Sequence, residues 1–272
     1  VWVGPGSSSI LASIAHAMGG PGTSAVFSEN SFVLYSIISA IARTKPIAVP
    51  LEATMHLDAA AMADSVDPDT TVLYFCNPNN PTGTYVPPTA VEQLVIAVPD
   101  DVLVVIDEAY EEYVTHPDHR TAMPLALRRP NVVVARTFSK IYGLAGLRVG
   151  YAIGQAPTLA ALRRLQLPFA TTSLSLAAAQ EALRHQDLVA DRAKANSRGR
   201  DQLTAGLREL EIPYLDSQTN FILTCPDGDA GELTESLLER GVIVRHMAEY
   251  LRVTVGSEAE NARFLQTVGE LL

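Results

Sequence analysis

The sequence has few lysines, cysteines and tryptophans, and no surplus of positive charge. Its 272 residues include three lysines, two cysteines and one tryptophan, and 20 basic against 30 acidic side chains give a net charge of −10. Nucleic-acid binding requires a basic face, so this balance argues against it. Cys76 and Cys225 are too few for a disulfide framework, and both lie in apolar stretches. We therefore expect buried free thiols in a reducing cytoplasm.

Long hydrophobic runs are also absent. No apolar stretch approaches the roughly 18 residues that a membrane span needs, so we expect a soluble cytoplasmic protein without membrane contact. With 47% hydrophobic and 18% charged residues, the composition is that of an ordinary globular protein. The opening residues, Val1 to Gly4, read as a strand or loop already inside a fold. We therefore expect that the N-terminal part of the first domain is missing from this sequence.

One of the three lysines, Lys140, has a conspicuous position. It follows the apolar run 132–135, which reads as a buried strand, within the segment Thr137-Phe138-Ser139-Lys140. Folds of the α/β class place their ligand chemistry where such strands end. A lone lysine of this kind is usually a solvated surface residue, and Lys45 and Lys194 look peripheral. The interpretation of Lys140 therefore depends on what accompanies it.

Two motifs upstream accompany the lysine. The segment NPNNPTG (77–83) follows the apolar run 71–76, and DEAY (107–110) follows the apolar run 102–106. Pyridoxal phosphate (PLP) chemistry needs an amine that holds the cofactor aldehyde. It also needs a carboxylate, in a poorly solvated pocket, that keeps the ring nitrogen protonated. Lys140 and Asp107 are of the required types.

The three motifs, in this order, resemble those of fold-type I PLP-dependent aminotransferases of class I/II. The resemblance extends from about Gly4 to the C-terminus and is carried by NPNNPTG (77–83), DEAY (107–110) and TFSKIYGLAGLRVGY (137–151). It looks most like the branch of histidinol-phosphate and aromatic amino-acid aminotransferases. The resemblance implies PLP as cofactor, small amino and keto acids as substrates, no metal, and a homodimer with its sites at the subunit boundary.

Strand and helix patterns alternate through the first part of the chain. This predicts an α/β fold with a doubly wound, largely parallel sheet, and the resemblance implies seven strands with helices on both faces. After Pro168 the pattern changes to a long helical region and then a small α+β domain. We therefore predict a large PLP-binding domain over 1–168, and a bridging helix with a small C-terminal domain over 169–272. The expected strands are 25–27, 47–50, 71–76, 102–106, 132–136, 147–153, 220–224, 242–245 and 251–255, and the resemblance implies that 147–153 runs antiparallel. The expected helices include 10–18, 89–97, 173–210, 231–240 and 258–272, the last opened by a capping box from Ser257 to Glu260.

The resemblance implies roles around the cofactor. Lys140 would hold the aldehyde and move the substrate α-proton. Asp107 would face the ring nitrogen, and Asn80 and Tyr110 would hydrogen-bond the phenolic oxygen. Phe32 would stack on the ring. The cofactor phosphate would be held by Gly6, Ser7, Ser8, Thr137, Ser139 and Arg148. The N-terminus of the helix that follows Gly6, which the serines could cap, would add to this site. The implied cofactor set is Gly6, Ser7, Ser8, Phe32, Asn80, Asp107, Tyr110, Thr137, Ser139, Lys140 and Arg148.

The substrate groups implied by the resemblance come mainly from the C-terminal region: Asn80, Asn220, Arg245 and Arg252. Arg252 matches the family arginine that grips the substrate carboxylate, and Arg245 matches a position that can reach a phosphate or distal acid. Two features depart from histidinol-phosphate enzymes. Ser8 and Ser9 stand where an acidic pair is frequent, and the segment 246–251 looks short.

Several functions are compatible with these residues. The first is transfer of an amino group between histidinol phosphate and 2-oxoglutarate, and the second is an aromatic amino-acid aminotransferase acting on phenylalanine or tyrosine. A PLP-dependent decarboxylase or lyase, such as a threonine-phosphate decarboxylase, would use the same lysine and aspartate. A PLP-fold domain kept for assembly or regulation is disfavoured, because such a domain would not need the full set of site residues.

Overall fold

The computed structural model describes residues 1–272 and contains two β-sheets. The larger sheet has the order β1-β7-β6-β5-β4-β2-β3. Neighbours from β3 to β6 are parallel, whereas β7 is antiparallel to both β6 and β1. The predicted seven-stranded, mostly parallel sheet is therefore confirmed. Its strands are β1 (Trp2–Gly4), β2 (Ser24–Ser28), β3 (Lys45–Val49), β4 (Thr70–Cys76), β5 (Leu103–Asp107), β6 (Val132–Thr137) and β7 (Gly150–Ile153).

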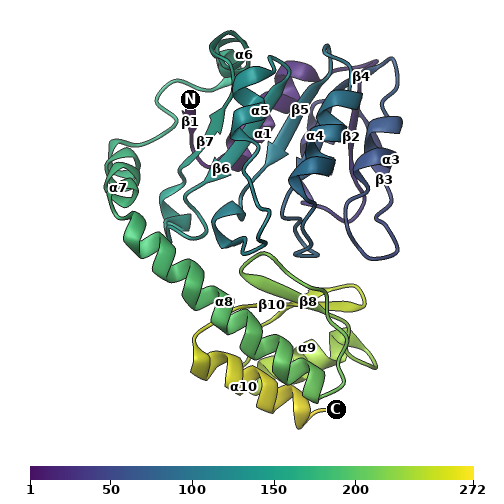
Figure 1. The fold of residues 1–272 in the computed structure, drawn as a ribbon, viewed down its shortest axis with the longest axis vertical. Coiled ribbons are helices and arrows are strands. Elements are labelled where there is room, and N and C mark those ends of the chain that lie inside the picture. The colour runs from purple at the N-terminus through teal and green to yellow at the C-terminus, as the bar shows by residue number, and fades with distance from the viewer.

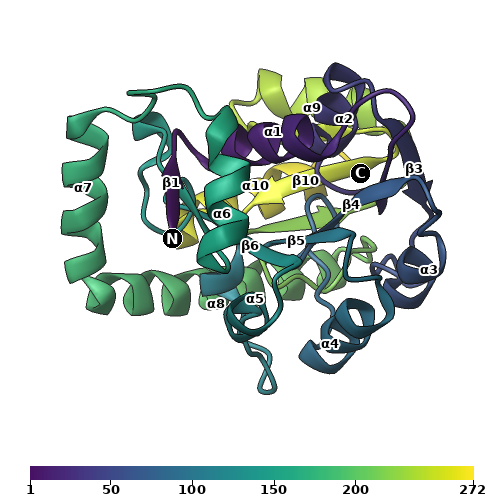
Figure 2. The same cartoon turned by 90° about the horizontal axis from the view of Figure 1, so that it is seen from above.

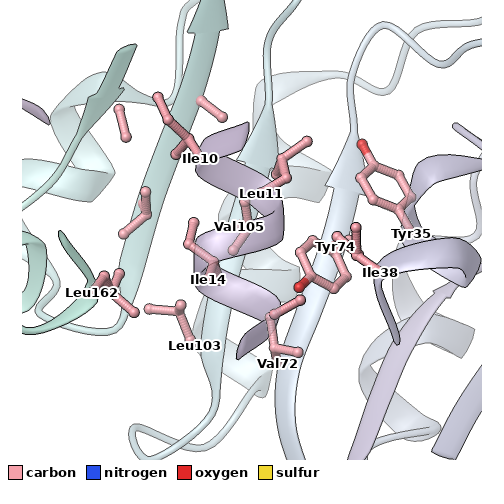
Figure 3. Close-up of a cluster of buried hydrophobic side chains, with 14 of the residues drawn as sticks. Ile10, Leu11, Ile14, Tyr35, Ile38, Val72, Tyr74, Leu103, Val105 and Leu162 are labelled. Atoms are coloured by element: carbon pink, nitrogen blue, oxygen red, sulfur yellow. The ribbon is translucent and has the colours of Figure 1, made fainter. Parts of the chain in front are cut away.

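Helices cover both faces of this sheet (Figure 2). One face carries α1 (Ser7–Met18), α2 (Leu34–Ile41) and α6 (Ala156–Leu162). The other carries α3 (Ala59–Asp64), α4 (Pro88–Ala97) and α5 (Met123–Arg128). Alternate residues of a central strand enter opposite cores: Val105 packs with α1, and Val104 packs with the α4 side. Figure 3 shows the first of these cores, where Ile14 of α1 lies over the strands. Burial on both faces explains why the central strands are nearly continuous apolar runs.

A second, smaller sheet forms after two consecutive helices, α7 (Ser173–Arg184) and α8 (Gln186–Glu209). Its antiparallel strands have the order β8 (Phe221–Thr224), β10 (Tyr250–Thr254) and β9 (Arg245–Met247). Helix α9 (Ala230–Glu239) and helix α10 (Glu258–Gly269) complete this part, and α8 leads from α7, beside the large sheet, to the small sheet, where it packs with α10 (Figure 1). The capping box of Ser257 and Glu260 is present as predicted. The boundary at residue 168 stays a prediction. No helix combines the length and the apolarity that crossing a bilayer requires.

Some predicted boundaries were wrong. The strand expected at 242–245 begins only at Arg245, because residues 242–244 have no strand opposite them and Ile243 is 84% exposed. The strand expected from 147 begins at Gly150, since Arg148 adopts a left-handed backbone with φ 52°. The helical region expected over 173–210 is interrupted at His185, whose backbone is not helical.

Two further expectations were wrong near the N-terminus and at a cysteine. The serines do not cap α1. Gly6 precedes the helix with a φ of 87°, no side chain caps it, and Ser7 is already the first helical residue.

Cys76 is buried as expected, but Cys225 is only partly buried. Cys225 lies just beyond the end of β8, where neighbouring elements cover it less completely.

Candidate active site

The carboxyl ends of neighbouring strands β4, β5 and β6 meet at one edge of the large sheet. A cavity of about 230 Å³ lies there. Of the eleven predicted cofactor residues, all except Gly6 line it. Gly6 does not line the cavity, but it packs against Arg148, which does: a Cβ at position 6 would come within 2.6 Å of the Arg148 guanidinium. The cavity is lined by Ser7, Ser8, Phe32, Asn80, Asp107, Ala109, Tyr110, Thr137, Ser139, Lys140, Ala145 and Arg148.

Asp107 forms the buried end of the cavity. It is the last residue of β5, and only 2% of its surface is exposed. Burial raises its pKa to about 6. This rise is opposed by hydrogen bonds from the Tyr35 hydroxyl to Oδ2 (2.9 Å) and from the Ala109 amide to Oδ1 (3.2 Å), and by the charge of Lys140. The carboxylate is therefore a desolvated acceptor that hydrogen bonds help to keep ionised.

Sequence reasoning missed Tyr35 as part of this site. Tyr35 lies on α2, is fully buried, and is 72 positions from Asp107 along the chain. The available signal was indirect: a tyrosine on an apolar helix face needs a partner for its hydroxyl once it is buried.

Lys140 enters the same cavity. Its ammonium nitrogen lies 5.0 Å from the centre of the Tyr110 ring. Burial and the nearby Arg252 lower its pKa, while Asp107 acts in the opposite direction. The side chains of Lys45 and Lys194 are each 72% exposed and pair weakly with surface aspartates. Lys140 is therefore the single lysine with access to the cavity, and its lowered pKa makes the neutral, nucleophilic amine easier to reach than on an exposed lysine.

Another part of the cavity lining is suited to an anion. The first residues of α1, Ser7 and Ser8, line it, and Arg148 stands beside Ser139, with Nη1 and Oγ 3.5 Å apart. Arg148 also donates to the carbonyl oxygen of Ala145 at 2.9 Å, which fixes its side chain near the cavity mouth. A Cβ at Gly150 would overlap the amide nitrogen of Ser7. The glycine therefore lets β7 approach the start of α1 closely.

Two of the predicted substrate residues meet across the two sheets. Nη1 of Arg252, on β10, donates to Oδ1 of Asn80 at 2.6 Å, and the guanidinium lies 4.8 Å from the Phe221 ring centre. The Nε atom of Arg252 is buried and has no hydrogen-bond partner. A buried donor without a partner is costly, so this N–H is poised for an anionic ligand.

The other two substrate residues are placed differently. Asn220 is partly buried and lines a larger cleft of about 770 Å³, which also reaches Lys140. Arg245 is exposed on β9, directly opposite Arg252 in the strand register, and lines neither cavity. The structure therefore brings Asn80, Asn220 and Arg252 near the lysine, while Arg245 stays at the periphery.

Comparison with known proteins identifies the family. The model for aminotransferase class I and II matches residues 1–268. The chain belongs to this family. The aminotransferase is 40% identical to histidinol-phosphate aminotransferase 1 of Dechloromonas aromatica over 275 aligned residues, which cover 99% of this chain and 75% of the relative. It is 42% identical to histidinol-phosphate aminotransferase 2 of Pseudomonas aeruginosa, covering 100% of this chain and 75% of the relative.

A solved structure agrees with the sequence relatives. The histidinol-phosphate aminotransferase of Sinorhizobium meliloti in complex with PLP superposes with a TM-score of 0.92 at 25% identity, covering 100% of this chain and 77% of that chain. This aminotransferase is accordingly PLP-dependent. Its own cavity fits the cofactor: an amine, a desolvated carboxylate, an arginine and the start of a helix all line it.

Proposed function

We propose that this aminotransferase moves an amino group between histidinol phosphate and 2-oxoglutarate. The observation that carries the proposal is the convergence of Lys140, Asp107 and Arg148 on one small cavity, with the unpaired Arg252 donor beside it. The choice of histidinol phosphate is supported by the relatives at 40% and 42% identity, which carry that name.

Each residue contributes a distinct physical task in this proposal. Bound PLP supplies an electrophilic aldehyde and a ring that delocalises negative charge. Lys140 holds the aldehyde and then moves a proton at the substrate α-carbon, for which its lowered pKa is suitable. Asp107 holds a proton on the ring nitrogen. Phe32 would pack against the ring, and Asn80 and Tyr110 would hold its phenolic oxygen.

The anionic groups have separate partners in the proposal. The cofactor phosphate is bound by Ser7, Ser8, Thr137, Ser139 and Arg148, where Gly6 allows the close turn. The substrate carboxylate is bound by Arg252, with Asn220 beside it, and the phosphate of the amino substrate lies toward Arg245. Arg245 stands opposite Arg252 in the register of β9 and β10, so both side chains project from the same face of the small sheet.

Half-reaction kinetics with single amino donors test the substrate. We expect histidinol phosphate to convert the cofactor at least about tenfold faster than phenylalanine, because a bound phosphate adds charge-assisted hydrogen bonds. Conversion is followed by the loss of visible absorbance, in the absence of keto acid. A faster reaction with phenylalanine would favour the aromatic aminotransferase, for which the segment 138–144 is equally suitable. Release of CO2 would instead identify a decarboxylase.

We further propose that the aminotransferase is a homodimer in which the segment around α7 contacts a second copy. Helix α7 projects from one side of the molecule in both views (Figures 1 and 2). Only two of its residues, Ser175 and Ala179, are buried. Large apolar side chains on and before it are exposed, including the fully exposed Phe169 and the largely exposed Leu174. Such a patch is typical of a protein interface.

Sedimentation velocity tests the dimer. At micromolar concentration, we expect the wild-type chain to sediment as a dimer and the double variant Phe169→Glu/Leu174→Glu as a monomer, because charges would be buried without partners. Leu127→Glu, on the exposed side of α5, is the matched control and should remain dimeric. A monomeric wild type, or a dimer that survives the double substitution, contradicts the proposed interface.

A further inference from the structure

A buried tyrosine stands directly behind the proposed site. Tyr35 of α2 donates its hydroxyl to Oδ2 of Asp107 at 2.9 Å, and neither side chain is accessible to solvent. A hydrogen bond from a neutral donor to a carboxylate is stronger than one between neutral groups. In a desolvated setting it gains further strength, because little water competes for either partner.

The ring of Tyr35 is held in place from several sides. It stacks on Tyr74 of β4 with ring centres 5.0 Å apart and an angle of 8°, and Phe32 contacts it edge-on at 5.7 Å. Phe32 also lines the cofactor cavity. The two stacked tyrosines point their hydroxyls in opposite directions (Figure 3). Only the Tyr35 hydroxyl meets a partner, since the buried Tyr74 hydroxyl has none.

The remaining groups around Asp107 do not replace this contact. The Ala109 amide donates to the other oxygen, Oδ1, at a longer 3.2 Å. Lys140 favours the ionised carboxylate through its charge, and Glu108 disfavours it. Cys76 lies opposite Asp107 in the strand register, is itself buried, and directs its thiol toward the Pro78 carbonyl oxygen. Among these neighbours, Tyr35 contributes the largest effect that keeps Asp107 ionised.

We propose that Tyr35 is a positioning residue: its hydroxyl orients Asp107 and stabilises the carboxylate form that the cofactor ring nitrogen requires. The inference rests on the role proposed above for Asp107. Tyr35 does not touch the reacting atoms, and it acts on PLP only through the carboxylate. The stacked Tyr74 and the edge-on Phe32 supply the rigidity that makes the contact effective.

The matched pair Tyr35→Phe and Tyr74→Phe tests this role. Both substitutions keep a buried ring in the same stack, but only the first removes a hydrogen bond to Asp107. Equilibrium titration of the apoprotein with PLP should show about tenfold weaker binding for Tyr35→Phe, and binding within about twofold of wild type for Tyr74→Phe. Carbon-13 NMR of labelled aspartate in the apoprotein should show a higher Asp107 pKa in Tyr35→Phe alone.

A double-substitution cycle separates positioning from core packing. In an Asp107→Ala background, Tyr35→Phe should weaken PLP binding no further, because the group through which it acts is gone. Equal behaviour of Tyr35→Phe and Tyr74→Phe in both measurements, or a full additional loss in the Asp107→Ala background, would overturn the inference and leave the proposed function standing. If the wild-type chain does not bind PLP at all, the proposed function fails instead.

Discussion

Replacing Lys140 with alanine abolishes the visible absorbance band that PLP acquires on the wild-type protein, and lowers transamination by at least about a thousandfold. The side chain supplies both the amine that holds the aldehyde and the group that moves the α-proton. No other lysine can substitute, because Lys45 and Lys194 are exposed and line neither cavity. Absorbance spectra of the reconstituted variant and a coupled assay with 2-oxoglutarate measure the two effects.

The two remaining lysines provide the controls for this substitution. Lys45→Ala and Lys194→Ala remove only weak surface pairs, with nitrogen–oxygen distances of 3.9 and 4.0 Å, so both should keep wild-type spectra and activity. An unchanged band in Lys140→Ala would show that the cofactor is attached elsewhere and would refute the proposed role.

Asp107→Asn has two effects of opposite sign. Activity falls by at least about a hundredfold, because a neutral amide does not keep the ring nitrogen protonated. In the apoprotein, however, the substitution removes a destabilisation that grows as the pH rises. Burial raises the pKa of Asp107 from 3.8 to about 6, so the stability linked to its protonated form is complete below pH about 4 and is lost as the pH rises through 6. The ionised form therefore costs on the order of 3 kcal/mol at neutral pH.

Urea unfolding of the apoproteins between pH 4 and pH 8 measures this second effect. Relative to wild type, the free energy of unfolding of Asp107→Asn should increase with pH by on the order of 2–3 kcal/mol across this range. Asp216→Asn, which alters an exposed carboxylate, is the matched control. A difference between wild type and Asp107→Asn that stays constant with pH would mean that Asp107 is not destabilised by burial.

The parts of the site that were predictable are those encoded locally. DEAY and the segment ending in Lys140 each follow a buried strand, and neighbouring parallel strands end at the same edge of the sheet. The proximity of Asp107 and Lys140 therefore follows from strand order.

Contacts between distant elements were not predictable. The Tyr35–Asp107 bond joins a helix to a strand end, and the Arg252–Asn80 bond joins residues 172 positions apart. The residue types in these two bonds indicated only that each side chain needs a hydrogen-bond partner when it is buried, not which partner it finds. The strand expected at 242–245 was wrong for a related reason: its three consecutive β-branched apolar residues suit a strand, but a strand also needs a neighbour, and the sequence does not say where that neighbour lies.

Reduction of the PLP-loaded protein with borohydride, followed by peptide mapping, examines the covalent claim directly. The reagent fixes the cofactor on the nitrogen that holds it, and a chain with three lysines leaves few possibilities. We expect a single phosphopyridoxyl label, on Lys140. A label on Lys45 or Lys194, or no label on any of the three, would contradict it.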